Sequence, residues 1–190
     1  MAAFGIRVIY CILQIIYCGQ IFLCFYSFFY GYLKFTMKHL ALDLGTSTGW
    51  AVHIDGQKKL FSGVVSFKTN RFSGGGVRFL KFKKWLDIID SEYGGFDQVE
   101  FEEVRRHLGV DAAHIYGGFL AVLSGWCEDK GVAYQGYPVG TIKKHATGKG
   151  NANKDDVIKS IKQKGYQPTT SDEADAIAVM LLALDDAKNI

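Results

Sequence analysis

From residue 38 onward, apolar positions follow two different periods along the chain. Short apolar runs bounded by turn residues predict β-strands, and longer stretches with apolar residues three and four apart predict amphipathic helices. The expected strands cover residues 38–44, 50–54, 59–67, 96–101 and 132–137. The expected helices cover residues 77–93, 111–130, 139–146, about 154–164, and 171 to about 187. This order predicts an α/β fold, a five-stranded mixed sheet with helices on both faces.

Turn residues divide these elements. Asp55-Gly56 predicts a two-residue hairpin, because both residues tolerate positive φ, so the first three strands form an antiparallel meander. The glycine-rich stretch 73–76 is an expected flexible loop near substrate.

Four carboxylates stand at notable places in this pattern. Asp43 and Glu102 end two expected strands, whereas Asp172 and Asp175 open the last helix. Residues three apart on a helix share a face, so both aspartates can point at one ion. Carboxylates gathered in a partly buried site cost free energy unless a cation neutralises them. The four acids therefore predict a divalent-metal site.

Each acid also has a simpler interpretation when it is taken alone. Asp43 could form a turn before Gly45, and Asp172 is favoured near a helix N-terminus by the helix dipole. Asp175 has no such simple interpretation, because it interrupts the apolar side of the expected helix.

The neighbouring acids receive other roles. Glu173 follows Thr170 by three residues and is assigned to a capping box. Glu100 and Glu103 flank Glu102 and are expected to face solvent. The histidines are not expected to bind metal, because no pair has ligand spacing.

Composition changes sharply at Met37. Residues 1–36 contain no acid and only two basic residues, Arg7 and Lys34, and the apolar stretch 8–33 is long enough to span a bilayer. This leader is either a membrane anchor or translated upstream sequence before a natural start at Met37. We favour the start at Met37, because Met37-Lys38-His39 leads directly into the first strand. The expected organisation is therefore a leader, 1–36, and one domain, 37–190.

Charge and cysteine content limit the function. The 190-residue chain has a formal net charge of +3, and residues 37–190 carry 20 basic and 19 acidic side chains. Any contact with nucleic acid must therefore come from local basic clusters. Cys127 is the only cysteine after the leader, which excludes an internal disulfide and fits a reducing cytoplasm.

Four segments together resemble the RuvC-type Holliday junction resolvases of the ribonuclease H-like superfamily. They are Leu42-Asp43-Leu44-Gly45, Phe101-Glu102-Glu103-Val104, the basic segment 143–154, and Asp172-Glu173-Ala174-Asp175-Ala176-Ile177-Ala178. The resemblance covers 38–190, and the compact form is similar to phage-encoded members, which would act in the cytoplasm of a bacterial host. The segment 68–79 and Arg105-Arg106-His107 depart from the family pattern.

The resemblance implies a structure-selective endodeoxyribonuclease that nicks four-way or other branched DNA. Its four metal-binding acids fall on Asp43, Glu102, Asp172 and Asp175. Two lysines near the scissile phosphate fall on Lys143 and Lys154. Basic residues expected to contact DNA phosphates are Arg78, Arg105, Arg106, Lys144 and Lys149.

The chemistry requires no small-molecule cofactor. Two Mg²⁺ ions about 3.5–4 Å apart can activate water and neutralise developing charge, and Mn²⁺ is a possible substitute. Mg²⁺ binds oxygen ligands, so the carboxylates suffice. Asp43 is the best candidate to bridge both ions. The small residues of helix 111–130 suggest a homodimer, and a membrane would be a partner only if residues 1–36 are genuine.

Three alternatives remain open. Residues 43–49 also resemble the phosphate-binding hairpin of sugar-kinase and actin-like ATPases, which need a second domain. Another ribonuclease H-like nuclease would act on an RNA–DNA hybrid or on flaps. A catalytically silent DNA-binding or membrane-anchored protein is the third.

Overall fold

The computed structural model describes residues 36–105 and 109–188, and these residues contain five strands and five helices. The strands are β1 (Lys38–Asp43), β2 (Ser47–Ile54), β3 (Phe61–Ser66), β4 (Gln98–Glu103) and β5 (Ala133–Pro138). The helices are α3 (Val77–Tyr93), α4 (Val110–Lys130), α5 (Val139–Thr147), α6 (Lys154–Gln163) and α7 (Ser171–Ala187).

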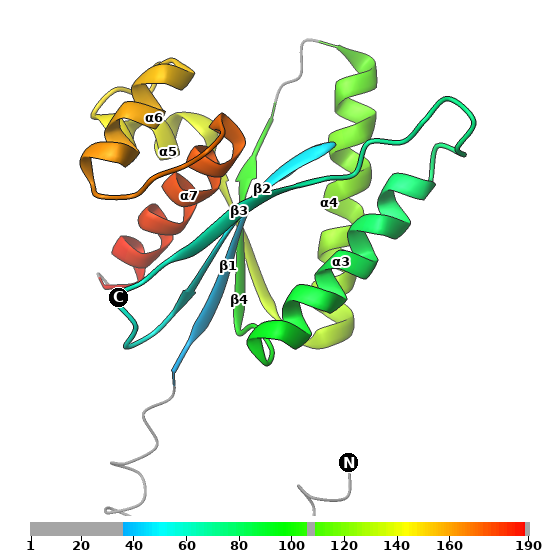
Figure 1. Ribbon diagram of the computed structural model, residues 1–190, viewed down its shortest axis with the longest axis horizontal. Helices are drawn as coiled ribbons and strands as arrows, with labels where there is room; N and C mark the ends of the chain where they lie inside the picture. Colours follow the sequence, from blue (N-terminus) through cyan, green and yellow to red (C-terminus); the bar gives the residue numbers. More distant parts are fainter. Residues whose placement is uncertain (1–35, 106–108, 189–190) are drawn as a thin grey trace, which may run out of the picture. The chain divides into compact units, whose positions relative to one another are not determined.

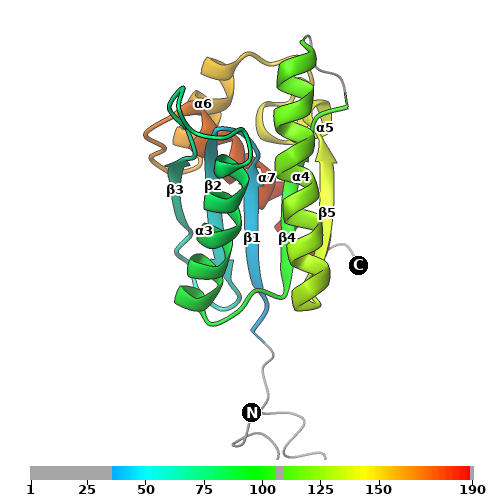
Figure 2. The same ribbon diagram turned by 90° about the vertical axis from the view of Figure 1, so that its right-hand side faces the viewer.

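The five strands form one mixed sheet in the order β3-β2-β1-β4-β5, which Figure 1 shows nearly edge-on and Figure 2 shows from one face. β1, β2 and β3 pair as an antiparallel meander, and β4 and β5 extend the sheet in parallel to β1. The predicted α/β architecture, a five-stranded mixed sheet with helices on both faces, is confirmed. β1 lies at the centre of the sheet. The residue at its end, Asp43, therefore has β2 on one side and β4 on the other.

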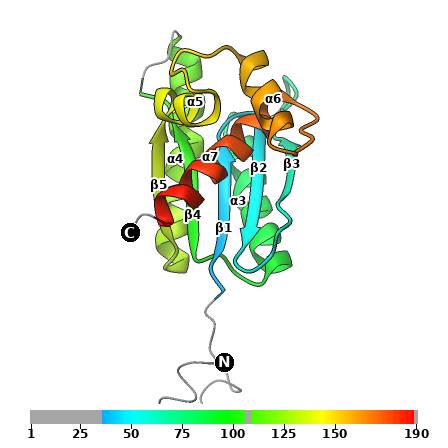
Figure 3. The same ribbon diagram turned by 90° about the vertical axis from the view of Figure 1, so that its left-hand side faces the viewer.

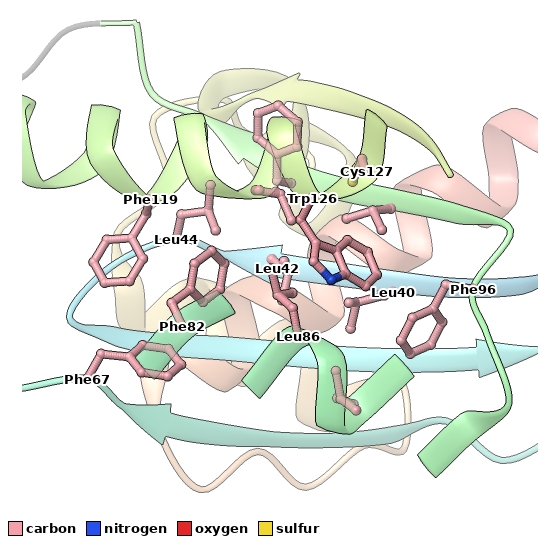
Figure 4. Close-up of a cluster of buried hydrophobic side chains, with 14 of the residues drawn as sticks. Leu40, Leu42, Leu44, Phe67, Phe82, Leu86, Phe96, Phe119, Trp126 and Cys127 are labelled. Atoms are coloured by element: carbon pink, nitrogen blue, oxygen red, sulfur yellow. The ribbon is translucent and has the colours of Figure 1, made fainter. Parts of the chain in front are cut away.

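The helices form a layer on each face of the sheet. α3 and α4 cover one face and α7 crosses the other, beside α5 and α6 (Figures 2 and 3). Alternation along β1 divides its side chains between these layers: Leu40 and Leu42 enter the core under α3 and α4, and Ala41 packs under α7. Figure 4 shows the first core, where Phe82 and Phe119 lie edge to face with ring centroids 5.0 Å apart.

Element boundaries differ from the expected ones at two places. Glu102 lies one residue before the end of β4 rather than beyond it. Among the described residues only glycines have positive φ, so Gly56, but not Asp55, adopts that conformation. The hairpin is also longer than two residues, because β3 begins only at Phe61.

The expectation that Glu100 faces solvent is wrong. Its side chain is fully buried on the α7 face of the sheet, and its Oε1 lies 2.8 Å from His39 Nδ1. The hydrogen bond to Glu100 raises the pKa of His39, and burial raises the pKa of Glu100. Alternation explains the placement, because residues two apart share a face, so Glu100 accompanies Glu102. Glu103 is partly exposed and pairs with Arg105.

Replacing His39 with alanine should lower the free energy of unfolding by about 3–5 kcal/mol, because Glu100 would stay buried without its partner. Chemical denaturation measures this loss. A double variant, His39→Leu with Glu100→Leu, should recover most of it, since an apolar pair needs no compensating bond. A double variant as unstable as the single one would show that packing, not the pair, carries the stability.

Predictions about residues 1–35, including the leader and the membrane alternative, lie outside the described residues. Within residues 36–105 and 109–188, no helix is long and apolar enough to cross a membrane. Cys127 is buried, and burial raises the pKa of its thiol to about 12.

Candidate metal-binding site

Asp43 and Glu102 come together at one end of the sheet because their strands are parallel neighbours. Leu42 lies opposite Phe101 in the pairing of β1 with β4, so the next residue on each strand is one of the two acids. Alternation turns both side chains away from the α3 and α4 core toward α7. Both residues are half-buried. The first two predicted ligands are therefore adjacent.

The other two acids come from the first two turns of α7. Asp172 and Asp175 are one helical turn apart and are both half-buried. Gly49 of β2, which pairs with Asp43, permits the close approach of this helix end. A Cβ at Gly49 would lie 1.8 Å from the carbonyl oxygen of Asp172, so any side chain there would push α7 away.

The electrostatics show that the four acids form one cluster. Burial, followed by the charges of Glu102, Asp175 and Asp172, raises the pKa of Asp43 well above its usual range. Burial and the charge of Asp175 raise the pKa of Glu102 to about 7. Burial likewise raises the pKa of Asp175, to which the charge of Asp172 adds. The charges of all three other predicted ligands thus reach Asp43.

The two predicted lysines lie at the same cluster. The charge of Lys154 lowers the pKa of Asp43, and both Lys143 and Lys154 lower the pKa of Glu102 and of Asp175. Lys154 Nζ lies 4.0 Å from Asp172 Oδ1. Lys143 comes from α5 and Lys154 opens α6, and Figure 3 shows both helices at the end of the sheet where α7 begins. The lysines partly offset the charge of four carboxylates.

Two serines donate hydrogen bonds to the Asp172 carboxylate. Ser47 Oγ donates to Asp172 Oδ2 at 2.7 Å, and Ser171 Oγ donates to Oδ1 at 3.2 Å. Within the described part of the chain, no three acidic, histidine or cysteine side chains converge closely enough to hold an ion between them.

The donor set fits a hard divalent cation. All four side chains offer carboxylate oxygens, which Mg²⁺ and Mn²⁺ accept as ligands. Burial, together with neighbouring acids, raises the pKa of Asp43, Glu102 and Asp175, so their ionised forms are disfavoured in the protein alone. A divalent cation placed among these side chains would supply positive charge and so favour their ionised form. The ligand set remains a prediction.

The capping-box assignment of Glu173 is half correct. Thr170 caps α7, because its Oγ1 accepts from the Glu173 backbone N–H at 3.1 Å. The Glu173 carboxylate does not return to the cap residue. It accepts instead from the backbone and hydroxyl of Thr169, and from Ser62 Oγ on β3 at 2.7 Å. Glu173 therefore fastens the start of α7 to the edge of the sheet.

The predicted DNA-contacting residues fall into different surroundings. Lys144 and Lys149 are exposed on and just after α5. Arg78 is half-buried near the start of α3 and donates to Thr69 Oγ1 at 3.4 Å. Arg105 is exposed and pairs with Glu103 at 3.0 Å. Arg106 lies outside the described residues.

Sequence reasoning missed Phe72, in the loop between β3 and α3. Its side chain is 84% exposed, and the Arg71 guanidinium lies 4.8 Å from its ring centroid. The loop leaves β3 beside the turn after Asp43, since Phe67 N–H donates to the Thr46 carbonyl at 2.8 Å. The sequence did offer one signal for this residue. Phe72 lies between Arg71 and the glycine run and is not part of an apolar period.

Comparison with known proteins shows which solved structures share this architecture. No protein-family model matches the chain, and no curated protein matches it by sequence. RuvC from Thermus thermophilus superposes with a TM-score of 0.66 at 22% identity, over 80% of this chain and 96% of that protein. The same protein in complex with a Holliday junction substrate gives a TM-score of 0.64 at 22% identity, over 75% and 90% of the two chains.

A more distant protein shares the architecture. The yeast mitochondrial Holliday junction resolvase superposes with a TM-score of 0.53 at 11% identity, over 76% of each chain. At these identities the likeness concerns the fold. The resemblance deduced from the four sequence segments is thus matched in three dimensions: the chain has the RuvC-like, ribonuclease H-like fold.

Proposed function

We propose that this protein is a metal-dependent endonuclease that nicks four-way or otherwise branched DNA by hydrolysing phosphodiester bonds. The observation that carries the proposal is the proximity of Asp43, Glu102, Asp172 and Asp175, with two lysines, at one end of a RuvC-like sheet. The structural neighbours support the substrate class, since they are Holliday junction resolvases and one is bound to such a junction.

Asp43 would be the central metal ligand, because the charges of all three other acids act on it. Glu102 would bind from the β4 side, and the aspartates of α7 from the other. When bound, divalent ions such as Mg²⁺ supply activation of water and neutralisation of charge on the transferred phosphate. Burial raises the pKa of Asp43, Glu102 and Asp175, so bound cations would also favour the ionised form of these three carboxylates.

The two lysines would act on the substrate. Lys154 is exposed and Lys143 is half-buried, and both charges act on the acid cluster. An ammonium group there would hold the phosphate against the carboxylates and stabilise the negative charge that develops during hydrolysis. Lys144 and Lys149 would extend this contact along the DNA backbone without reading sequence.

Preference for branched DNA would arise from shape and from exposed bases. Figure 2 shows the loop after β3 and the helices α5 and α6 at the end of the sheet where β1 terminates. Phe72 stands exposed in that loop, and an aromatic ring offers a stacking surface to bases that are unpaired, as at a branch point. A linear duplex presents no such base.

A homodimer would present two such sites to two DNA strands. Gly117 and Gly125 leave open space on α4 where a Cβ would stand, and Ala121 between them is exposed. Gly118 has another role, because a Cβ there would lie 2.3 Å from the Phe79 ring of α3. The outer side of α4 is therefore the proposed dimer contact, and sedimentation at working concentration tests it.

Side-by-side cleavage of three labelled substrates tests the function. The full chain is incubated with Mg²⁺ and a four-way DNA junction, an RNA–DNA hybrid or a linear DNA duplex. We expect nicks in the junction and little cleavage of the duplex or the hybrid. Preferential cleavage of the hybrid would contradict the proposed substrate while keeping the nuclease site. No cleavage of any substrate would contradict the proposal.

A further inference from the structure

The carboxylate of Asp172 is held by two unequal sets of contacts. Ser47, which precedes it by 125 residues in the chain, donates to Oδ2 at 2.7 Å. The contacts to Oδ1 are longer: Ser171 Oγ lies at 3.2 Å and Lys154 Nζ at 4.0 Å. The Oδ2 bond joins the helix to the sheet, whereas the Oδ1 contacts come from the same helix end and from a flexible side chain.

Ser47 sits on a hairpin that is itself fixed. Thr48, the next residue, is fully buried, and its Oγ1 donates to the Gly45 carbonyl at 2.8 Å. The Thr46 carbonyl accepts from Phe67 N–H at 2.8 Å, which ties the turn to the end of β3. The hydroxyl of Ser47 therefore projects from backbone with little freedom to move.

The same hairpin also sets the position of the α7 backbone. Gly49 approaches the Asp172 carbonyl so closely that a Cβ would lie 1.8 Å from its oxygen, and Gly49 is the pairing partner of Asp43. One strand thus contacts Asp172 through its backbone at Gly49 and through a side chain at Ser47. These two contacts hold the start of α7, and with it Asp172, against the strand that pairs with β1.

The contact between Asp172 Oδ1 and the Lys154 ammonium can be replaced more easily than the bond to Oδ2. The Lys154 side chain is 69% exposed, so its ammonium can leave Asp172 without disturbing the core. Its positive charge, with the hydroxyl of Ser171 at 3.5 Å from Nζ, occupies the side of Asp172 that is not held by the sheet. A lysine near carboxylates supplies a weak substitute for a divalent ion, because it brings one charge instead of two.

We propose that Ser47 is a positioning residue, which holds Asp172 by Oδ2 so that Oδ1 is presented to a divalent cation in exchange for Lys154. This inference rests on the proposed function, since it assigns Asp172 to the metal site. A hydrogen-bond partner behind a ligating carboxylate fixes the ligand's orientation, and its loss typically weakens metal binding about 10–100-fold.

Calorimetric titration of the full chain with Mn²⁺ tests the proposal. Ser47→Ala is expected to weaken Mn²⁺ binding about 10–100-fold. Ser47→Thr keeps a hydroxyl and is expected to restore most of the affinity. The matched control is Ser62→Ala, which removes an equally short serine–carboxylate bond, to Glu173 on the same helix end. This control should leave Mn²⁺ affinity close to that of the wild type.

Equal weakening by Ser47→Ala and Ser62→Ala would overturn the proposal, because the effect would then be a general loosening of α7. Unchanged binding in Ser47→Ala, beside a wild type that binds Mn²⁺ through Asp43, would overturn it while leaving the proposed function intact. A wild type whose Mn²⁺ binding is unaffected by Asp43→Asn would overturn both.

The Mg²⁺ dependence of cleavage gives a second measurement. Loss of a positioning contact should raise the Mg²⁺ concentration that gives half-maximal cleavage, while the rate at saturating Mg²⁺ stays near the wild-type rate. A lowered saturating rate with an unchanged half-maximal concentration would contradict a role in metal binding.

Discussion

Asp43→Asn should abolish DNA cleavage, with a loss of at least about a thousandfold, the upper end of the effect of removing one preorganised charged or polar group from an active site. Asp43 is the acid on which all three other carboxylates act, so it lies at the centre of the cluster. Asparagine has nearly the same shape but lacks the negative charge, and only one of its two side-chain polar atoms can ligate a cation. Single-turnover cleavage of a labelled four-way junction measures the effect.

The matched control for this substitution is Glu103→Gln. Glu103 lies on the neighbouring strand β4, beside a proposed ligand, but its carboxylate pairs with the exposed Arg105. Exposed ion pairs contribute at most about 1 kcal/mol, so this change should leave the cleavage rate close to that of the wild type. Binding of the junction should persist in both variants. Equal losses of cleavage in the two variants would contradict the assignment of Asp43 to the catalytic centre.

Removing divalent cations should destabilise the protein at neutral pH, and the effect should disappear toward pH 5. The folded state raises the pKa of Glu102 from 4.5 to about 7, so the folded protein retains a proton that the unfolded chain releases. In the absence of cations this group's contribution to stability is therefore full below pH 4.5 and falls as the pH rises toward 7. The shift corresponds to about 3 kcal/mol of unfolding free energy.

Bound cations should oppose this loss, because they favour the deprotonated carboxylates. The raised pKa values of Asp43 and Asp175 act in the same direction. Thermal unfolding with Mg²⁺ and with chelator, between pH 5 and 8, measures the difference. A loss of 3 kcal/mol lowers Tm by about 6–12 °C in a domain of this size. The buried His39–Glu100 pair also titrates, but its contribution is common to both conditions and cancels in the comparison.

Asp43→Asn again provides the control. Without cations at pH 7 to 8 this variant should be more stable than the wild type, since it removes one of four mutually repelling charges. Its Tm should also respond little to Mg²⁺. A wild-type Tm that is the same in Mg²⁺ and chelator throughout this pH range would contradict the cation site.

The positions of the four acids were predictable because local rules determine each one. Alternation along β1 and β4 turns Asp43 and Glu102 to the same face, and the helical period does the same for Asp172 and Asp175. The resemblance to resolvases then supplied the long-range arrangement, which the parallel pairing of β1 with β4 and the place of α7 confirm. Spacing alone does not say which strand ends meet.

The contacts that support the acids were not predictable in the same way. Ser47 and Asp172 are 125 residues apart, and Ser62 and Glu173 are 111 residues apart. Neither serine interrupts an apolar period, so neither stands out in the sequence. The burial of Glu100 depends on its pairing with His39. His39 lies on the adjacent strand β1, two positions before Ala41, which is the residue directly opposite Glu100. Such contacts follow from the register between elements, which hydrophobic periodicity does not determine.

The most direct test of the central claim is the pattern of nicks in a four-way DNA junction incubated with the full chain and Mg²⁺, beside a linear duplex that carries the same sequences. A metal-dependent, structure-selective nuclease is expected to introduce paired nicks near the branch point, to leave the duplex uncut, and to lose this activity in chelator and in Asp43→Asn. Binding of the junction without any Mg²⁺-dependent nick would contradict the account.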